Sequence, residues 1–295
     1  IYRDVIDVHG SQDISLDDER VLGTINQAVY SAVSELMFLS ERFPDAAAAS
    51  LCCYRGIRHF FRLGRENFEK ADALFKQAHD LQPRGIYMAW RAYLRTFMLA
   101  ERQYDCRETL IEETGALLQH ALEVEPGNSF VQAMAAQVYC IVNRSYLPSY
   151  HFAQESVRLN RANALGWALL GITRCHLGQE EEGYRNTAWA RSIAGTSPYR
   201  FHVDAMCCIA ATMAGRFEDA IKYGEICHAG AVKFAPPLRY LSALYYHNRD
   251  YERSFEMVNK MKLIENDFSY GKLREMSYPT ASLRRSPVFE CLPAS

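Results

Sequence analysis

Apolar side chains recur at intervals of three and four residues along most of the chain, a pattern typical of amphipathic α-helices. The first clear instance covers residues 17–41, where Asp17 or Asp18 could cap a helix. Its apolar stripe consists of Val21, Ile25, Val29, Val33, Leu36 and Leu39. Because this helical pattern continues to about residue 268, the chain is predicted to be all-α.

The two ends of the chain lack this periodicity. Residues 1–16 alternate only briefly between apolar and polar positions, which indicates an extended remnant or linker. The first residue is Ile1 rather than Met, so we expect the chain to be a piece of a longer polypeptide. Residues 269–295 contain Pro279 and Pro287 and few periodic positions, and they are predicted to form an irregular capping tail.

Short motifs recur along the chain, which indicates internal repeats. The pattern Ala-x3-Phe-x2-Ala-x4-Pro at 71–83 returns in part at 118–126 as Leu-x2-Ala-x4-Pro. Residues 214–220 (AGRFEDA) align with 248–254 (NRDYERS), 34 positions later, and 178–183 fit the same slot one repeat earlier. One helix pair cannot bury its own apolar face, so such repeats must stack.

Five helix pairs and a sixth, shorter one account for the repeats. The predicted pairs are 47–83, 86–126, 129–161, 163–196, 199–233 and 236–265. The second pair carries an insertion of about nine residues relative to the repeat period. Residues 101–113 supply it, and we expect a longer loop or longer helices there.

These repeats resemble the tetratricopeptide repeat. Trp167, Leu170, Gly171 and Ala190 match its pattern in one repeat, and Ala71, Phe75, Ala78 and Pro83 match the second half of an earlier one. Individual repeats depart from the pattern, with Arg161 in a proline slot and Cys208 in a glycine slot. The resemblance implies a right-handed superhelical solenoid of about five to six pairs over residues 17–268, with the first helix of each pair lining a concave groove.

A narrower resemblance rests on three short segments. They are 17–25 (DDERVLGTI), Tyr54-Arg-Gly56 and the stretch from Ser277 to Pro287. They are similar to the C-terminal tetratricopeptide region of bacterial winged-helix transcriptional regulators or of class III adenylate or guanylate cyclases. The resemblance implies an output domain upstream of Ile1, and leaves open which of the two it is.

The implied groove positions are mostly apolar. They are Tyr87, Trp90, Leu94, Phe97, Met134, Val138, Ile141, Ile172, Cys175, His202, Ile209, Arg239 and Tyr246. A long exposed apolar strip would favour aggregation, so we expect another protein segment or a ligand to cover it. The candidates are the chain's own N-terminal helix or tail, a helix from a partner or a second copy, and a small apolar ligand that Arg239, His202 and Tyr246 would orient.

Composition narrows the function classes. Hydrophobic residues make up 49% of the 295 positions and charged residues 23%, which is typical of a globular protein. The net charge of -2 argues against broad non-specific binding to nucleic acid or to a membrane surface. Nucleic acid is therefore expected only through an upstream domain.

The nine cysteines indicate a reducing, cytoplasmic compartment. Their number is odd and no C-x-x-C motif is present, so a disulfide framework is disfavoured. The adjacent pairs Cys52-Cys53 and Cys207-Cys208 could be redox sensors, but burial in helices is favoured. Cys175-His176 and Cys227-His228 do not have the spacing of a zinc site, so neither metal nor cofactor is expected.

One helical face between residues 55 and 65 is basic. Arg55, Arg58 and Arg62 recur there at spacings of three and four, with His59 and Arg65 beside them. This stripe could meet nucleic acid, a phosphate-bearing ligand or an acidic partner. The alternative is a solvated helix face whose arginines pair with Glu66 and Glu69.

No phosphate-binding loop, G-x-S-x-G or H-E-x-x-H motif occurs, so a non-catalytic role is predicted. We expect a protein-interaction or sensory region of a bacterial signalling regulator, which binds a partner, a second copy or an effector and controls an attached output domain, most readily transcription. The alternatives are a small-molecule receptor with an apolar ligand in the groove, and the regulatory region of a nucleotide cyclase.

Overall fold

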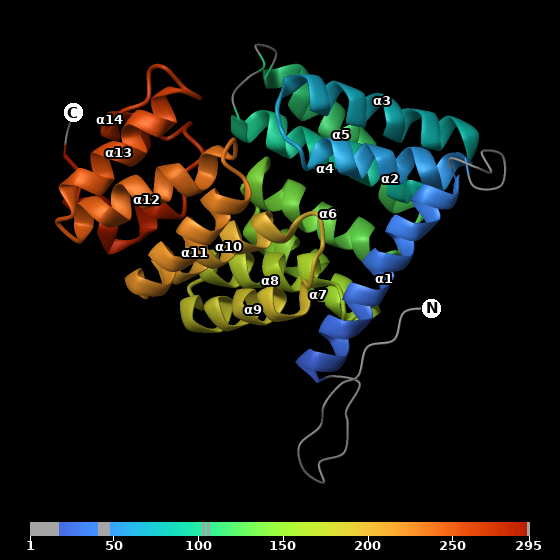
Figure 1. The fold of residues 1–295 in the computed structure, drawn as a ribbon, viewed down its shortest axis with the longest axis horizontal. Coiled ribbons are helices and arrows are strands. Elements are labelled where there is room, and N and C mark those ends of the chain that lie inside the picture. The colour runs from blue at the N-terminus through green and yellow to red at the C-terminus, as the bar shows by residue number, and fades with distance from the viewer. Residues whose placement is uncertain (1–17, 41–47, 102–103, 105–106, 294–295) are drawn as a thin grey trace, which may run out of the picture. The chain divides into compact units, whose positions relative to one another are not determined.

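The computed structural model describes residues 18–40, 48–101, 104 and 107–293, and for residues 33–40 only the course of the helix (Figure 1). These residues form fourteen α-helices and two short 3-10 helices, with no strand among them. The predicted all-α class is confirmed. The extended remnant predicted at residues 1–16 lies outside the described residues.

Six consecutive helix pairs follow the first helix, α1 (Glu19–Ser40), which does not belong to a pair. The pairs are α2 (Ala48–Phe60) with α3 (Arg65–Leu81), α4 (Gly85–Glu101) with α5 (Arg107–Val124), α6 (Ser129–Ile141) with α7 (Tyr146–Leu159), α8 (Ala164–His176) with α9 (Glu180–Ile193), α10 (Arg200–Met213) with α11 (Phe217–Gly230), and α12 (Ala235–His247) with α13 (Tyr251–Lys262). Each pair falls within one predicted span to within a few residues. The chain ends in α14 (Tyr270–Arg274), η1 (Leu283–Arg285) and η2 (Pro287–Cys291).

The chain divides into two compact units. Unit 1 comprises Ile1–Leu169 and Trp189–Arg200, and unit 2 comprises Leu170–Ala188 and Phe201–Ser295. Helices α1 to α7 therefore belong to unit 1, and α11 to α14 with both 3-10 helices belong to unit 2. Helices α8 and α9 contribute residues to both units, and α10 belongs to unit 2 except for Arg200.

The insertion predicted in the second pair lengthens its helices. Helix α4 has 17 residues and α5 has 18, whereas α6 has 13 and α7 has 14. An α-helix rises 1.5 Å per residue, so four extra residues add about one turn to each helix.

The turns inside the pairs reuse one backbone conformation. Gly178 has φ 84° between α8 and α9, and Gly215 has φ 71° between α10 and α11. Arg144 and Arg249 occupy the corresponding places in two other pairs, with φ of 52° and 62°. Glycine adopts this left-handed conformation without strain, whereas a residue with a Cβ carries a cost there. The repeat thus fixes the turn geometry even where the glycine is lost.

Small residues allow the paired helices to cross closely. A Cβ on Gly171 would lie 2.5 Å from the Gly183 carbonyl oxygen, and a Cβ on Gly183 would lie 2.4 Å from Cys175 Sγ. Backbone therefore meets backbone where α8 crosses α9, within unit 2. No larger side chain fits at either position without moving a helix.

Polar side chains define where several helices begin. The Asn128 Oδ1 accepts hydrogen bonds from the backbone N–H groups of Phe130 (3.0 Å) and Val131 (3.4 Å) at the start of α6. Asp250 caps α13 by accepting from the Arg253 N–H at 3.2 Å. These contacts satisfy donors that a helix N-terminus leaves free.

Aromatic packing dominates the interior of unit 1. Phe60 at the end of α2 lies edge-on to Tyr93 and Phe97 of α4, with ring centroids 5.6 and 4.8 Å away. Phe75 of α3 stacks on Trp90 of α4 at 5.9 Å. Such pairs add stabilisation beyond the apolar area they bury.

An ionic network ties α3, α4 and α5 together in unit 1. Asp72 accepts hydrogen bonds from Arg91 Nε (2.9 Å) and Arg95 Nη1 (2.7 Å), and Arg95 Nε donates to Glu113 at 2.8 Å. Burial alone raises the pKa of Asp72, but the hydrogen bonds from the two guanidinium groups outweigh it and the net shift is downward. Asp72 therefore stays ionised and holds both arginines in place.

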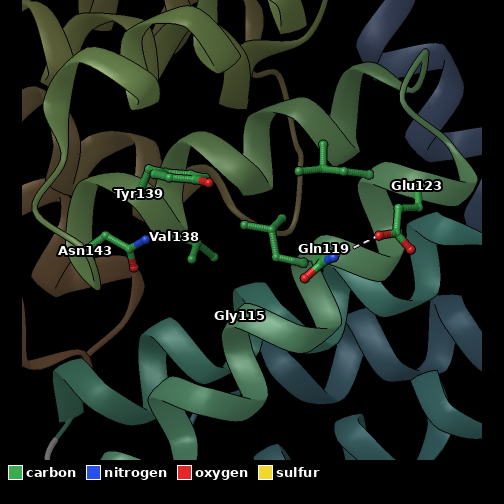
Figure 2. Close-up of a pocket in the computed structure, with 8 residues that line it drawn as sticks. Gly115, Gln119, Glu123, Val138, Tyr139 and Asn143 are labelled. Carbon is green, nitrogen blue, oxygen red and sulfur yellow. Dashed lines mark hydrogen bonds between the residues drawn. The ribbon is translucent and has the colours of Figure 1, made fainter.

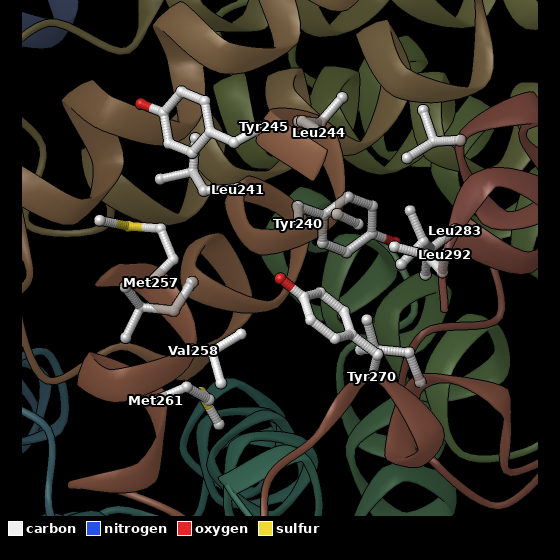
Figure 3. Close-up of a cluster of buried hydrophobic side chains, with 14 of the residues drawn as sticks. Tyr240, Leu241, Leu244, Tyr245, Met257, Val258, Met261, Tyr270, Leu283 and Leu292 are labelled. Atoms are coloured by element: carbon white, nitrogen blue, oxygen red, sulfur yellow. The ribbon is translucent and has the colours of Figure 1, made fainter. Parts of the chain in front are cut away.

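The core of unit 2 continues into the C-terminal segment. Figure 3 shows Leu241 and Leu244 of α12 and Met257 and Met261 of α13 in the same buried cluster as residues from α14, η1 and the chain end. The buried contributions from that end are Tyr270, Leu273, Tyr278, Leu283, Val288 and Leu292. Full burial of an aliphatic side chain is worth about 1.5–3 kcal/mol, so these residues anchor the segment firmly.

Candidate functional site

The predicted groove residues of unit 1 are mostly buried. Tyr87, Trp90, Leu94 and Phe97 of α4 face the aromatic interior or the neighbouring helices, and Met134 and Val138 of α6 are equally inaccessible. Ile141, at the end of α6, is 40% exposed. The described chain therefore covers most of these positions itself, and their contact with a partner or ligand stays a prediction.

The predicted positions of unit 2 are also largely enclosed. Ile172 and Cys175 of α8 and His202 of α10 are buried, whereas Ile209 and Tyr246 are half-buried. Burial lowers the pKa of His202 to about 3, because the cationic form loses its hydration in this environment. His202 is thus uncharged near neutral pH.

Arg239, predicted at the groove rim, is buried inside unit 2 with only 1% of its side chain exposed. Its Nε donates to the Tyr278 hydroxyl at 2.9 Å, its Nη2 pairs with Glu265, and the Tyr278 hydroxyl donates to Glu265 Oε2 at 2.7 Å. We call these three residues the tail triangle, since Glu265 and Tyr278 both follow α13. Each of the three residues forms a hydrogen bond or ion pair with the other two, so the buried charges have partners.

His176 provides a second anchor for the C-terminal segment in unit 2. Its Nε2 lies 2.9 Å from the Ser282 hydroxyl, and Arg285 Nη1 donates to its backbone carbonyl at 2.5 Å. Burial, with a smaller contribution from the Arg285 guanidinium, lowers the pKa of His176 to about 4. The imidazole is therefore neutral at pH 7.

The cysteines of the helices are buried, as predicted for both adjacent pairs. The Cys207 thiol donates to the Thr187 carbonyl at 3.1 Å, and the Cys227 thiol donates to the Phe201 carbonyl at 3.0 Å, both within unit 2. Burial raises the pKa of Cys175 and of Cys53 to about 12. These thiols are protonated and unreactive. Cys291 is exposed, and Cys106 lies outside the described residues.

The arginine stripe consists of Arg55 and Arg58 on α2 and Arg62 in the turn that follows the helix, and all three are exposed. The two carboxylates expected to pair with it are engaged elsewhere, since Glu66 accepts from Lys70 at 2.6 Å and Glu69 accepts from Arg65 at 3.1 Å. None of the ion pairs among the described residues involves the stripe. It is a row of exposed cations.

A pocket of about 480 Å³ opens between α5 and α6 of unit 1 (Figure 2). Apolar and polar side chains line it together, and a 2.9 Å hydrogen bond joins Gln119 to Glu123. The lining residues are Gly115, Leu118, Gln119, Leu122, Glu123, Val138, Tyr139 and Asn143. No atom of a neighbouring element lies within 4 Å of a Cβ placed on Gly115. Small-molecule sites commonly combine apolar walls with a few polar groups in this way.

Helix α1 docks in unit 1 through its polar side, which the sequence did not reveal. Asn26 Nδ2 donates to the backbone carbonyls of Ala162 (3.0 Å) and Ile193 (2.6 Å), and Tyr30 donates from its hydroxyl to that of Tyr199 at 2.7 Å. The Thr196 hydroxyl donates to Gln27 Oε1 at 2.7 Å. Two members of the predicted apolar stripe are exposed, Ile25 at 42% and Val29 at 52%, whereas Val21 is buried.

None of the described helices has the length and hydropathy needed to cross a lipid bilayer. Among the described residues, no three His, Cys, Asp or Glu side chains converge in a way that could hold a metal ion.

No model of a known protein family matches the sequence, and no curated protein matches it at a significant level. Comparison with solved structures places the fold. The human IFIT1 dimer with m7Gppp-AAAA aligns with a TM-score of 0.59 and 15% identity, over 86% of this chain and 62% of that one. The APC/C hetero-tetramer Cut9-Hcn1 aligns with a TM-score of 0.57 and 13% identity, over 90% of this chain and 48% of that one.

A third structure, YrrB, described as a TPR protein with an unusual peptide-binding site, aligns with a TM-score of 0.39 and 16% identity, over 65% of this chain and 93% of that one. At such identities the likeness concerns the fold alone. Together with the six helix pairs, the comparisons establish an all-α fold of the tetratricopeptide-like helical solenoid type.

Proposed function

We propose that the chain is the non-catalytic interaction or sensory region of a cytoplasmic bacterial signalling regulator. It binds a protein partner or effector and passes the bound state to an attached output domain, with transcription as the favoured output. Stacked helix pairs suit this task, because small rotations between neighbours add up along the stack and a ligand can select among them.

The observation that carries this proposal is the exposed arginine stripe. Arg55 and Arg58 lie one turn apart on α2 and Arg62 follows in the turn after the helix, while the nearby Glu66 and Glu69 are already paired. A helix with carboxylates at spacings of three and four, lying antiparallel to α2, would meet Arg55 and Arg58 and extend toward Arg62. We therefore propose an acidic helix of a protein as the partner that docks on this face.

Fluorescence anisotropy with a synthetic helical peptide tests the proposal. The peptide carries glutamates at positions i, i+4 and i+7, and a scrambled peptide of equal charge serves as the reference. We expect Arg58→Glu to weaken binding by about tenfold or more, and the affinity to fall as salt rises. Arg158→Glu on α7 is the matched control, since Arg158 is exposed but pairs with Glu155 of its own helix.

Equal binding of the patterned and scrambled peptides would contradict the proposal. So would tighter binding of single-stranded RNA than of the peptide, an arm included because one structure of similar fold was solved with m7Gppp-AAAA.

The small-molecule alternative draws support from the pocket between α5 and α6. A hydrophobic fluorescent dye serves as the probe, with Gly115→Phe as the filling variant, because the space above Gly115 is open. Dye binding that saturates at one site and is lost in the filled variant would favour this alternative. Unchanged dye binding would dismiss it.

A further inference from the structure

The inner face of α1 is polar and regularly spaced. Gly23, Asn26, Gln27 and Tyr30 follow one another at i, i+3, i+4 and i+7, so they share one side of the helix. All four lie against the stretch from 192 to 199 of unit 1: Gly23 approaches the Ser192 carbonyl, and the other three form the hydrogen bonds to Ile193, Thr196 and Tyr199. A helix that docked by hydrophobicity alone would turn Ile25 and Val29 inward instead.

The amide of Asn26 fits its two acceptors in a specific way. Ile193 is the last residue of α9, where backbone carbonyls have no partner within the helix, and Ala162 lies in the connection between α7 and α8. Both carbonyls converge on one nitrogen. A primary amide supplies two N–H donors from that nitrogen, whereas a hydroxyl supplies one and a carboxylate supplies none. A side-chain amide therefore matches the pair of carbonyls without bringing in a charge.

The phenol of Tyr30 fits a second subsite four residues further along the helix. Its ring lies edge-on to that of Tyr199, with centroids 6.1 Å apart and planes at 77°. Tyr199 is buried, and its ring also contacts Phe61 beside the aromatic interior of unit 1. The hydroxyl-to-hydroxyl hydrogen bond sets the depth to which a phenol can enter.

We propose that the Ala162 and Ile193 carbonyls with the Thr196 and Tyr199 hydroxyls form a helix-recognition site, which reads a side-chain amide and a phenol four residues apart. Helix α1 is its intramolecular occupant, and a partner helix with the same two groups displaces α1. This rests on the proposed function, because it assigns unit 1 a second class of protein partner. It differs from that proposal in place and chemistry, since the arginine stripe reads acidic side chains.

Displacement is feasible because, among residues 18–32, exchangeable hydrogen bonds form a large part of the attachment of α1. Hydrogen bonds contribute little net stability each, since water replaces them when the helix leaves. Val21 and Leu22 are the buried apolar side chains among residues 18–32, while Ile25 and Val29 are exposed in the docked state and change little on release.

The test uses a fluorescent peptide of residues 18–40 and the full chain. In the chain carrying Asn26→Ala and Tyr30→Phe, α1 competes poorly for its own site. We expect the peptide to bind this double variant at least tenfold more tightly than the unaltered chain. A peptide with Asn26→Ala should bind at least tenfold more weakly, whereas a peptide with Ile25→Ser, altered on the exposed side, should bind as the original does.

Equal binding of the original and Asn26→Ala peptides would overturn the recognition site while leaving the acidic-helix proposal intact, because that proposal is measured with a different peptide. If the double variant does not fold, hydrogen exchange of the unaltered chain decides. Exchange in residues 18–32 at least a hundredfold faster than in α4 and α6 supports a displaceable helix, and protection equal to that of α4 and α6 overturns it.

Discussion

The N-terminal helix and the C-terminal segment are attached to their units by opposite means. Helix α1 donates hydrogen bonds to backbone carbonyls of unit 1 and leaves Ile25 and Val29 exposed. The segment after α13 buries apolar side chains such as Leu283 and Val288 in unit 2 and closes a buried ion pair around Arg239. Among residues 18–32, the first attachment combines hydrogen bonds with two buried apolar side chains, Val21 and Leu22, whereas the second extends the core of unit 2.

This difference predicts different roles for α1 and for the C-terminal segment. A segment whose removal leaves a charge unpaired and several apolar side chains in water cannot exchange with a ligand while the unit stays folded. A helix that exchanges a few hydrogen bonds with water can do so. Regulation by displacement is therefore expected at α1, and the C-terminal segment is expected to act as a structural cap.

We expect the largest loss of stability from a substitution in the tail triangle. Glu265→Gln removes the carboxylate charge that pairs with the buried Arg239 guanidinium. We expect the free energy of unfolding of unit 2 to fall by about 3–5 kcal/mol, measured by urea unfolding with hydrogen exchange of α12 and α13 as the readout. The surface pair Lys260–Glu256 is the control, and Glu256→Gln should cost about 0.5 kcal/mol. A loss of less than 1 kcal/mol for Glu265→Gln would show that the triangle does not secure the segment.

Acid should loosen the C-terminal segment before it affects α1. The folded pKa values of His176 and His202 lie at about 4 and about 3, below the ordinary value of 6.5. Between pH 6.5 and about 4 the unfolded chain binds protons that the folded chain refuses, so stability is full above pH 6.5 and falls as the pH falls. We expect a loss of about 1 kcal/mol per pH unit for each histidine in unit 2.

Thermal unfolding of unit 2 between pH 7 and pH 5 measures this slope, and His176→Gln should reduce it by roughly half. The hydrogen-bonding groups that hold α1 are two amides, two phenols and the Thr196 hydroxyl, and none of them titrates in this range. If lowering the pH accelerates hydrogen exchange of α1 as much as that of residues 282–292, the two ends of the chain do not differ in acid sensitivity.

Tyr30→Phe sharpens the comparison on the side of α1. The variant keeps the aromatic contact and removes the hydroxyl bound to Tyr199. We expect the local opening of α1 to become easier by about 1 kcal/mol, which is roughly a fivefold increase in its hydrogen exchange, with no change in unit 2. An equal decrease in protection across α4 and α6 would mean that α1 belongs to the cooperative core of unit 1.

The smallest effect is expected on the outer side of α1. Ile25→Ser and Val29→Ser alter side chains that are about half exposed, so each should change the stability of unit 1 by about 0.5 kcal/mol or less. Leu22→Ala is the matched comparison, because Leu22 is buried in the same helix and its truncation should cost about 2 kcal/mol. Urea unfolding of the three variants ranks them, and a reversed order would place the apolar stripe of α1 in a packed interface.

The fold was largely predictable because its signals are local and repeated. The alignment of 214–220 with 248–254 places Gly215 and Arg249 in one slot, and both have the left-handed backbone that the turn needs. The glycine at 171 marks a close helix crossing. Such features depend on neighbours within one repeat, so the sequence shows them directly.

The interactions of the candidate sites were harder to predict because their partners are distant in sequence. Asn26 reaches acceptors 136 and 167 residues away, and nothing near Asn26 indicates them. The periodicity favoured Ile25 and Val29 as the inner face, since an apolar stripe is usually the one that a helix buries. Arg239 was placed at a groove rim because its partners come from the tail, 26 and 39 residues later. The sequence feature that could have indicated its burial is an arginine among the otherwise apolar predicted groove positions.

The described cysteines differ in their access to solvent. Cys52, Cys53 and Cys140 are buried in unit 1, and Cys175, Cys207, Cys208 and Cys227 are buried in unit 2, while Cys291 is exposed. An alkylating reagent would modify Cys291 rapidly. It would modify each buried thiol only when the surrounding structure opens. Mass spectrometry of the labelled peptides would then time the opening of the two units separately in a single unmodified sample.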